Sequence, residues 1–101
     1  MNNIILCGRL TKEPEVKTVK DGLKIASFTL AIDRPVKKGS TKETDFIRIT
    51  TFGKLADIAE KYLEKGKYAL IRGRIQTGSY KKEDGSTTYT TDVIAEEIKL
   101  I

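Results

Sequence analysis

The sequence predicts an all-β fold with one short helix between the third and fourth strands. Apolar and polar residues alternate along most of the chain, which is the period of strands whose two faces differ. Only residues 52–67 change to the period of an amphipathic helix. The length of 101 residues is that of one domain with a modest core, so residues 1–101 are expected to form a single domain.

The first strand is predicted at residues 3–10, NIILCGRL, which is rich in branched apolar residues. Cys7 within it is expected to be a small buried residue. Pro14 then predicts a break or an edge position, and Asp21-Gly22 predicts a tight hairpin turn. The second strand, KIASFTLAID at residues 24–33, shows the clearest alternation in the chain.

The third strand, residues 44–52, follows a charged loop and has two faces of different chemistry. One face is expected to enter the core and carries Ile47, Ile49 and Thr51. The other face carries Phe46, Arg48, Thr50 and Phe52. Burial of one phenylalanine side chain is worth about 1.5–3 kcal/mol, so two rings left in water require an explanation.

The helix is predicted because apolar residues recur on one face, namely Leu55, Ile58, Ala59, Tyr62 and Leu63. Gly66 predicts its end after Lys65. Extended structure resumes at residues 68–77, and a long hairpin turns at Asp84-Gly85. The last segment starts as a strand in which Ile94, Ile98 and Leu100 can share a face. Its end, AEEIKL, fits either a strand or a helix.

This order of elements, three strands, one helix and two strands, is that of the five-stranded Greek-key barrel known as the OB-fold. The composition excludes several classes of function. With no histidine and one cysteine, the chain lacks an intrachain disulfide, a zinc ligand cluster and the commonest general base. We therefore expect no enzymatic activity, no catalytic residues, no cofactor and no metal.

Charge and hydropathy indicate where the protein works and what it binds. Nineteen lysines and arginines against fourteen acids give a net charge of +5, which favours polyanionic partners. No apolar run reaches the roughly 18 residues needed to span a bilayer, and the N-terminus carries no basic leader. A cytoplasmic, nucleoid-associated location without membrane contact is the expectation.

The outward face of the third strand, together with its neighbours, suggests single-stranded nucleic acid as the partner. Arg48 lies between the two rings, Arg72 and Arg74 share a face of the fourth strand, and flanking loops carry further cations and rings. These loop residues are Lys37, Lys38, Lys42, Tyr80, Lys81, Lys82 and Tyr89. Unpaired bases stack on rings while phosphates need positive charge, whereas a duplex hides its base faces.

Other interpretations of the same residues remain open at this stage. The helix, a loop or a second subunit can cover the phenylalanines, and the arginines can be solvated or paired with acids. Tyr80 and Tyr89 can form a cross-strand pair that only stabilises a hairpin. An OB-fold that docks a partner protein, or one that binds RNA, is the alternative function.

Several stretches, in order and near the expected spacing, resemble the bacterial single-stranded DNA-binding proteins. They are IILCGRLTKEPEVK, ASFTLAIDR, FIRITTFGKLADIAEKYLEKG and IRGRIQTGSY, and the resemblance covers essentially the whole chain. The most specific piece is FGKLADIAEKYLEKG followed by RGRIQT. The resemblance implies sequence-nonspecific binding and protection of single-stranded DNA in replication, recombination or repair.

The resemblance also implies roles for individual residues. Base stacking is assigned to Phe46, Phe52 and Tyr80. Contacts along the DNA path are assigned to Arg48 and Lys54, and with less support to Arg9, Arg72 and Arg74; the loop lysines Lys37, Lys38 and Lys81 extend the basic surface. In the family the first strand pairs across a dimer, and dimers associate into tetramers. That edge here is formed by Asn3, Ile4, Ile5 and Leu6.

The sequence departs from the family in places. It has no tryptophan, and at Pro35-Val36, where many members carry another stacking ring, it has none. Weaker stacking per site is expected from the missing rings. Gly78-Ser79 stand where members often place basic residues, for which Lys81 and Lys82 can compensate. Members usually continue into an acidic, phenylalanine-tipped tail that recruits replication and repair enzymes. Because this sequence ends at EEIKLI, partners that read such a tail are not expected to bind it.

Overall fold

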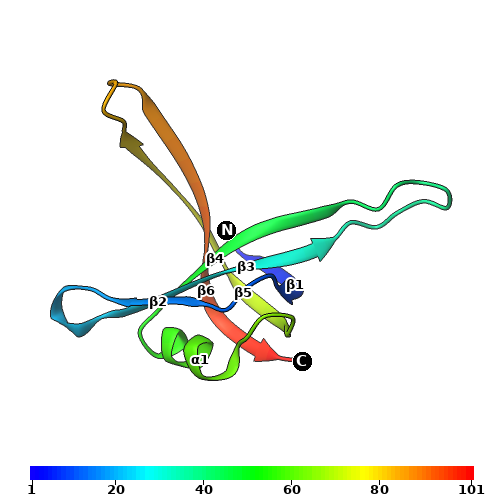
Figure 1. The fold of residues 1–101 in the computed structure, drawn as a ribbon, viewed down its shortest axis with the longest axis horizontal. Coiled ribbons are helices and arrows are strands. Elements are labelled where there is room, and N and C mark those ends of the chain that lie inside the picture. Colours follow the sequence, from blue (N-terminus) through cyan, green and yellow to red (C-terminus); the bar gives the residue numbers. More distant parts are fainter.

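The computed structural model describes residues 1–101 as a strand-rich fold with three projecting hairpins (Figure 1). In chain order the elements are β1 (Ile4–Leu10), β2 (Glu15–Thr18), the 3₁₀ turn η1 (Lys20–Gly22), β3 (Lys24–Asp33), β4 (Thr44–Phe52), α1 (Lys54–Tyr62), β5 (Tyr68–Lys81) and β6 (Thr87–Leu100). Neither helix has the length and apolar character needed to cross a membrane.

Five of the six strands close into a ring in the order β1, β5, β6, β4, β3 and back to β1. Neighbours in the ring are antiparallel except β4 and β6, which run parallel through the pairs Ile49–Val93 and Thr50–Ile94. The single α-helix lies between the third and fourth ring strands, so the predicted OB-fold is confirmed. The short β2 lies outside the ring and pairs only with β3; it follows Pro14, where the sequence predicted a break.

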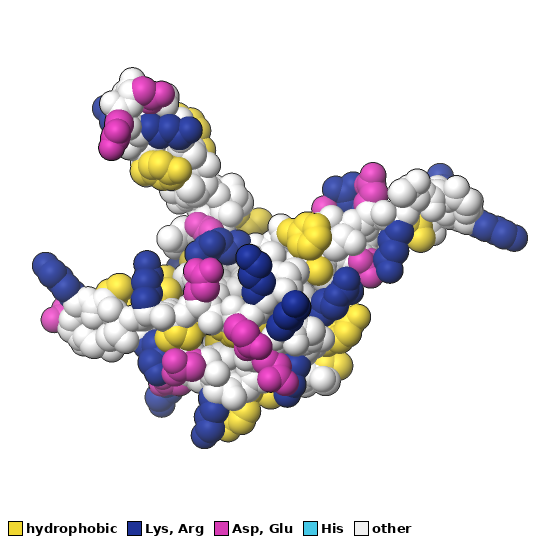
Figure 2. Space-filling view, in the orientation of Figure 1, with side chains coloured by type: hydrophobic (Ala, Val, Ile, Leu, Met, Phe, Trp, Pro, Cys, Tyr) yellow, Lys and Arg dark blue, Asp and Glu magenta, His cyan; other side chains and the backbone are white.

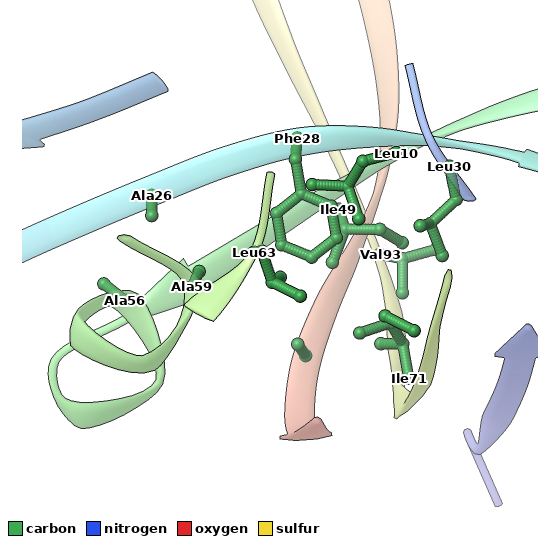
Figure 3. Packing of buried hydrophobic residues seen from close by; sticks show 12 residues of the cluster. Leu10, Ala26, Phe28, Leu30, Ile49, Ala56, Ala59, Leu63, Ile71 and Val93 are labelled. Atoms are coloured by element: carbon green, nitrogen blue, oxygen red, sulfur yellow. The ribbon is translucent and has the colours of Figure 1, made fainter. Parts of the chain in front are cut away.

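The core fills the inside of the ring and one end of it is covered by α1 (Figure 3). Leu30, Ile49 and Ile71 are fully buried and come from three different ring strands. Ala56 and Ala59 give α1 a flat apolar side, and the helix packs on β3, β4 and β6. Small residues on the helix allow it to lie close to the sheet.

The helix ends three residues before the predicted position. Leu63 has extended backbone angles (φ −96°, ψ 139°), although its N–H still bonds to the carbonyl of Ala59 at 3.1 Å. The Leu63 side chain is buried in the core, and the chain then turns at Gly66 (φ 87°), whose N–H donates to the carbonyl of Leu10. Burial of Leu63 therefore fixes the end of the helix, and Gly66 serves the following turn.

Two expectations about individual faces are wrong. Cys7 is exposed, because strand alternation turns its neighbours Gly8 and Leu10 inward. Ile94 does not share a face with Ile98, because the register between β5 and β6 shifts between Arg72 and Gly73. The tail of the chain is strand throughout, so β6 continues through AEEIKL to Leu100.

The three projecting hairpins, here called the β2–β3, β3–β4 and β5–β6 arms, extend in different directions from the ring (Figure 1). The β2–β3 arm turns at Asp21 (φ 65°) and Gly22 (φ 76°), as predicted for that pair. Lys24 anchors this arm to α1, because its ammonium lies 2.8 Å from carboxylate oxygens of both Asp57 and Glu60. The β5–β6 arm closes through the bond from the Lys82 N–H to the Ser86 carbonyl.

A charged cluster holds the base of the β3–β4 arm. The Nε and Nη2 groups of Arg34 donate to both carboxylate oxygens of Asp45 at 2.8–3.1 Å, and Nη1 donates to Glu43. Asp33 accepts from the Thr44 hydroxyl and lies 3.2 Å from the Lys42 ammonium. Hydrogen bonds from Arg34 lower the pKa of Asp45 below its ordinary value. Hydrogen bonds from Thr44 and Lys42 lower the pKa of Asp33 in the same way.

Replacing Arg34 with methionine should raise the pKa of Asp45 toward its ordinary value, because the hydrogen bonds from the guanidinium are its main cause. The measurement is a carboxyl titration followed by NMR. Asp84, whose pKa is lowered by Ser86 on another arm, is the internal control and should not change. An unchanged Asp45 titration in the variant would contradict the assignment.

The same shift predicts how the arm responds to acid. The folded pKa of Asp45 is below its unfolded value, so its contribution to stability is present above that unfolded value. The contribution is lost as the pH falls through the folded pKa. The protection of backbone amides in the β3–β4 arm, measured relative to their intrinsic exchange rates, should therefore fall in the wild type as the pH drops through this range. Arg34→Met should remove the part of this dependence that comes from Asp45, whereas the part that comes from Asp33 should remain.

Candidate nucleic-acid interface

The outward face of β4 presents two phenylalanine rings to solvent. Phe46 is 68% exposed and Phe52 is 40% exposed, while Ile49 and Thr51 between them are fully buried. The buried Thr51 hydroxyl is satisfied because it donates to the carbonyl of Ala26 at 2.8 Å. The alternation predicted for this strand is confirmed, and neither α1 nor a loop of this chain covers the rings.

Three of the four residues of β3 that face the outward side chains of β4 are short, and the fourth, Ile25, lies opposite Phe52. Opposite Phe46 is Ala31, opposite Arg48 is Thr29, and opposite Thr50 is Ser27. Facing residues of an antiparallel pair share one side of a sheet. Because none of these β3 side chains is long, a flat ligand can approach the β4 rings from outside the ring of strands.

The same outer face continues across β6 to the β5–β6 arm. Val93 faces Ile49 in the core, so Asp92, one residue earlier on β6, points outward. Tyr80 of β5 faces Thr88, which is four residues before Asp92 and therefore lies on the same side. The Tyr80 ring is 55% exposed. The strand register thus places Tyr80 on the same side of the sheet as Phe46 and Phe52.

Tyr89 lies on the opposite side of the β5–β6 arm. Its partner across the arm is Ser79, not Tyr80, so the two tyrosines are one register position apart and point to different faces. The cross-strand tyrosine pair considered from the sequence is therefore wrong. Tyr89 is 81% exposed and shares no face with the three rings described above.

The arginines near these rings differ in their partners. Arg48 makes no ion pair within the chain, and Arg74 bonds only to the neutral Gln76 at 2.8 Å. Arg72 instead contacts Glu97 at 3.0 Å and Glu96 at 3.4 Å. Pairing with acids, which the sequence left open for all three, occurs at Arg72 alone.

The other basic residues assigned to the interface lie around its margin. Arg9 is 4.0 Å from Asp33, at the limit of an ion pair. Lys54 opens α1 just after Phe52, Lys37 and Lys38 lie in the β3–β4 loop, and Lys81 ends β5. No acid pairs with these four lysines. Figure 2 shows Lys and Arg side chains at the ends of the projecting arms.

Two acids on this face were not identified from the sequence. Asp92 lines a groove with Arg48 and Phe52, and Glu15 of β2 lines the same groove. Each acid sits in an extended segment, but the sequence does not show which strands become neighbours. The parallel pairing of β4 with β6 brings Asp92 to this face, and that pairing joins segments about 45 residues apart.

The edge assigned to self-association is only partly paired. β1 pairs with β5 from Ile4 to Arg9, but it pairs with β3 only at Arg9 and Leu10. Its second edge is therefore open over residues 4–8. Ile5 on this strand is 62% exposed, and Asn3 precedes it as an exposed residue.

Comparison with known proteins places this geometry in a family. A family model described as the Single-strand binding protein family matches residues 1–101. Single-stranded DNA-binding protein 3 of Clostridium acetobutylicum is 48% identical over 102 residues, covering all of this chain and 71% of the relative. The single-stranded DNA-binding protein of Clostridium tetani is 45% identical, with 70% of its length covered.

A more distant genus gives the same result. Single-stranded DNA-binding protein 1 of Staphylococcus aureus strain Mu50 is 43% identical over all of this chain and 65% of the relative. The full-length family match, these identities and the closed five-stranded ring agree with one another. The chain therefore belongs to the Single-strand binding protein family.

Proposed function

We propose that this chain binds single-stranded DNA without strong sequence preference, as a single OB-fold domain and not as an enzyme. One observation carries the proposal: three exposed rings, Phe46, Phe52 and Tyr80, share an outer face with Arg48 and Arg74, which have no acid partner. The names of the relatives describe the same kind of ligand.

The rings act as stacking platforms for unpaired bases. Every base has an aromatic face, so stacking tolerates any sequence. Phe46 and Phe52 are six residues apart on one strand, and Tyr80 reaches the same face from the β5–β6 arm. A single strand that crosses the sheet from β4 toward this arm can therefore place successive bases on the rings. A duplex has its base faces stacked internally and offers nothing to these rings.

The cations without acid partners track the phosphates. We assign this role to Arg48, Arg74, Lys54 and the arm lysines Lys37, Lys38 and Lys81. Arg9 contributes less to phosphate binding, because it lies 4.0 Å from the Asp33 carboxylate. Arg72 already satisfies two carboxylates, so a phosphate has to compete with Glu96 and Glu97 for it. We therefore place Arg72 outside the main DNA path.

Self-association through the open β1 edge completes the proposed function. An unpaired strand edge is a template for pairing with another chain. Pairing of residues Asn3 to Leu6 with the same segment of a second copy would join two rings, and two such dimers would form a homotetramer. In the cytoplasm such an assembly would coat and protect strands exposed during replication, recombination or repair.

Substitutions of the rings test the stacking platform. Phe52→Ala and Tyr80→Ala should each weaken binding of a labelled single-stranded oligonucleotide by about 1–3 kcal/mol, the range usual for base stacking in OB-folds that bind single strands. Tyr89→Ala is the matched control, because this ring lies on the other side of the arm. Equal losses for Tyr80→Ala and Tyr89→Ala would contradict the assigned face.

Salt dependence tests the phosphate contacts. The logarithm of the association constant should fall linearly with the logarithm of salt concentration as counterions are released. Arg74→Met should reduce the magnitude of this slope by about 1, the effect of removing one phosphate contact. Arg72→Met, on the same strand but paired with two acids, should leave the slope nearly unchanged. The reverse order would contradict the assignment.

The β1 edge is tested by the mass of the protein in solution, measured by light scattering. The wild type should have four times the protomer mass of 11.3 kDa. Ile5→Glu should lower the mass, because it adds charge next to the open strand edge. Val36→Glu, at an apolar position of the β3–β4 arm that is 52% exposed, should not lower the mass. A wild-type mass of one protomer would refute the proposed assembly.

A further inference from the structure

The side chain of Asn2 bonds to the backbone of β5 at the point where the β5–β6 arm leaves the ring. Its Nδ2 group donates to the carbonyl of Ile75 at 2.7 Å, and its Oδ1 atom accepts from the N–H of the same residue at 2.9 Å. Figure 1 shows the N-terminus beside this point. No other side chain of the protein bonds to both backbone groups of one residue.

These two bonds continue the pairing of β1 with β5 by one more step. The last backbone pair of the two strands is Ile4–Gly73, and Asn2 and Ile75 each lie two residues beyond it in the same direction. Residues that face each other in an antiparallel pair can exchange both N–H···O bonds. Asn2 lies outside β1, and its carboxamide carries the same donor and acceptor as a peptide group. The side chain therefore takes the place of a backbone partner for β5.

Ile75 lies at the root of the β5–β6 arm. No residue of β1 pairs with β5 past Ile4, so beyond Ile75 the only strand neighbour of β5 is β6. Ile75 faces Val93 of β6, and Val93 pairs with Ile49 of β4. The root is therefore held on both flanks, by β4 on one side and by the Asn2 side chain on the other.

The way in which the root is held determines where the arm projects. A two-stranded hairpin alone is only marginally stable in water, so its position relative to the ring depends on its attachment. Arg74 directly precedes Ile75, and Tyr80 lies further along β5 on the arm. Both side chains belong to the proposed single-strand interface. A displaced root would therefore move them relative to the rings of β4.

We propose that Asn2 is a positioning residue, whose carboxamide holds the root of the β5–β6 arm so that Tyr80 can bind the same single strand as Phe46 and Phe52. The inference rests on the proposed single-stranded DNA binding. Asn2 acts through Ile75 and needs no contact with the DNA. Its bonds are directed toward β5, so they leave the second edge of β1 free for another chain.

A double-mutant cycle tests whether Asn2 acts through the arm. Asn2→Ala should weaken binding of a labelled single-stranded oligonucleotide about 2- to 10-fold, the usual effect of one lost hydrogen bond. In a Tyr80→Ala background the same change should weaken binding less than about 2-fold, because the ring that Asn2 positions is missing. In a Phe52→Ala background the full loss should remain, since Phe52 lies on β4.

A general loss of stability would give a different result in this cycle. It would weaken binding equally in the wild-type, Tyr80→Ala and Phe52→Ala backgrounds. Equal losses in the three backgrounds, or no loss in any of them, overturn the inference while leaving single-strand binding intact.

Amide exchange of the free protein tests the two bonds directly. The Ile75 N–H should lose protection in Asn2→Ala, measured relative to its intrinsic exchange rate, because its acceptor is removed. Asn3→Ala is the matched control for this measurement, because it removes the same carboxamide from a neighbouring exposed residue. It should leave the protection of Ile75 unchanged. Equal protection of Ile75 in the wild type and in Asn2→Ala overturns the inference.

The mass in solution separates this role of Asn2 from self-association. Asn2→Ala should have the same mass as the wild type by light scattering. A lower mass would assign the lost binding to assembly and overturn the inference. Failure of the wild type to bind the oligonucleotide overturns the proposed function itself.

Discussion

The architecture depends on the pairing of β4 with β3 on one side and β6 on the other. Because side chains alternate along a strand, this double pairing commits every residue of β4 either to the core or to the outer face. A shift of register by one residue would bring Phe46, Arg48 and Phe52 inside and expose Ile49. The fully buried Ile49 and the satisfied Thr51 hydroxyl oppose such a shift, so the core fixes the position of the outer rings.

Exposed rings on rigid strands cost stability but favour binding. Each phenylalanine left in water forgoes part of the 1.5–3 kcal/mol or so that its burial would provide. Phe46 and Phe52 are held in a paired strand, so the proposed stacking of a base on them would cost little conformational freedom. Tyr80 and Phe46 both lie where their strand pairs with only one neighbour.

Much of the fold and part of the interface could be predicted from the sequence. The two faces of β4, the hairpin turn at Asp21-Gly22 and the single helix follow from local periodicity and turn chemistry. The helix ends early because the Leu63 side chain is buried in the core. The place that Leu63 occupies exists only once the strands of the ring have come together, so local periodicity does not predict it. Cys7 is exposed because its position in the alternation of β1, and not its residue type, determines the face on which it lies.

The partners of surface charges could not be predicted, since they depend on which strands become neighbours. Arg72 and Arg74 are equivalent in the sequence, both pointing outward from one strand. The register shift beside Gly73 separates them: Glu96 and Glu97 reach Arg72, while Arg74 faces Ile94. A side chain at Gly73 would come within 2.1 Å of the Ile94 carbonyl, so the close approach of the two strands requires glycine there.

Ion pairing within the protein determines which of its cations remain for a ligand. A cation that already contacts a carboxylate gains less from a phosphate, because the first contact must be shared or broken. Lys24, Arg34 and Arg72 are used in this way to hold an arm or a strand end. Arg48 and Arg74 form no such ion pair. The net charge of +5 therefore does not show which cations are available to a ligand. Arg48 and Arg74, on the face of the exposed rings, have no acid partner, whereas Lys24, Arg34 and Arg72 do.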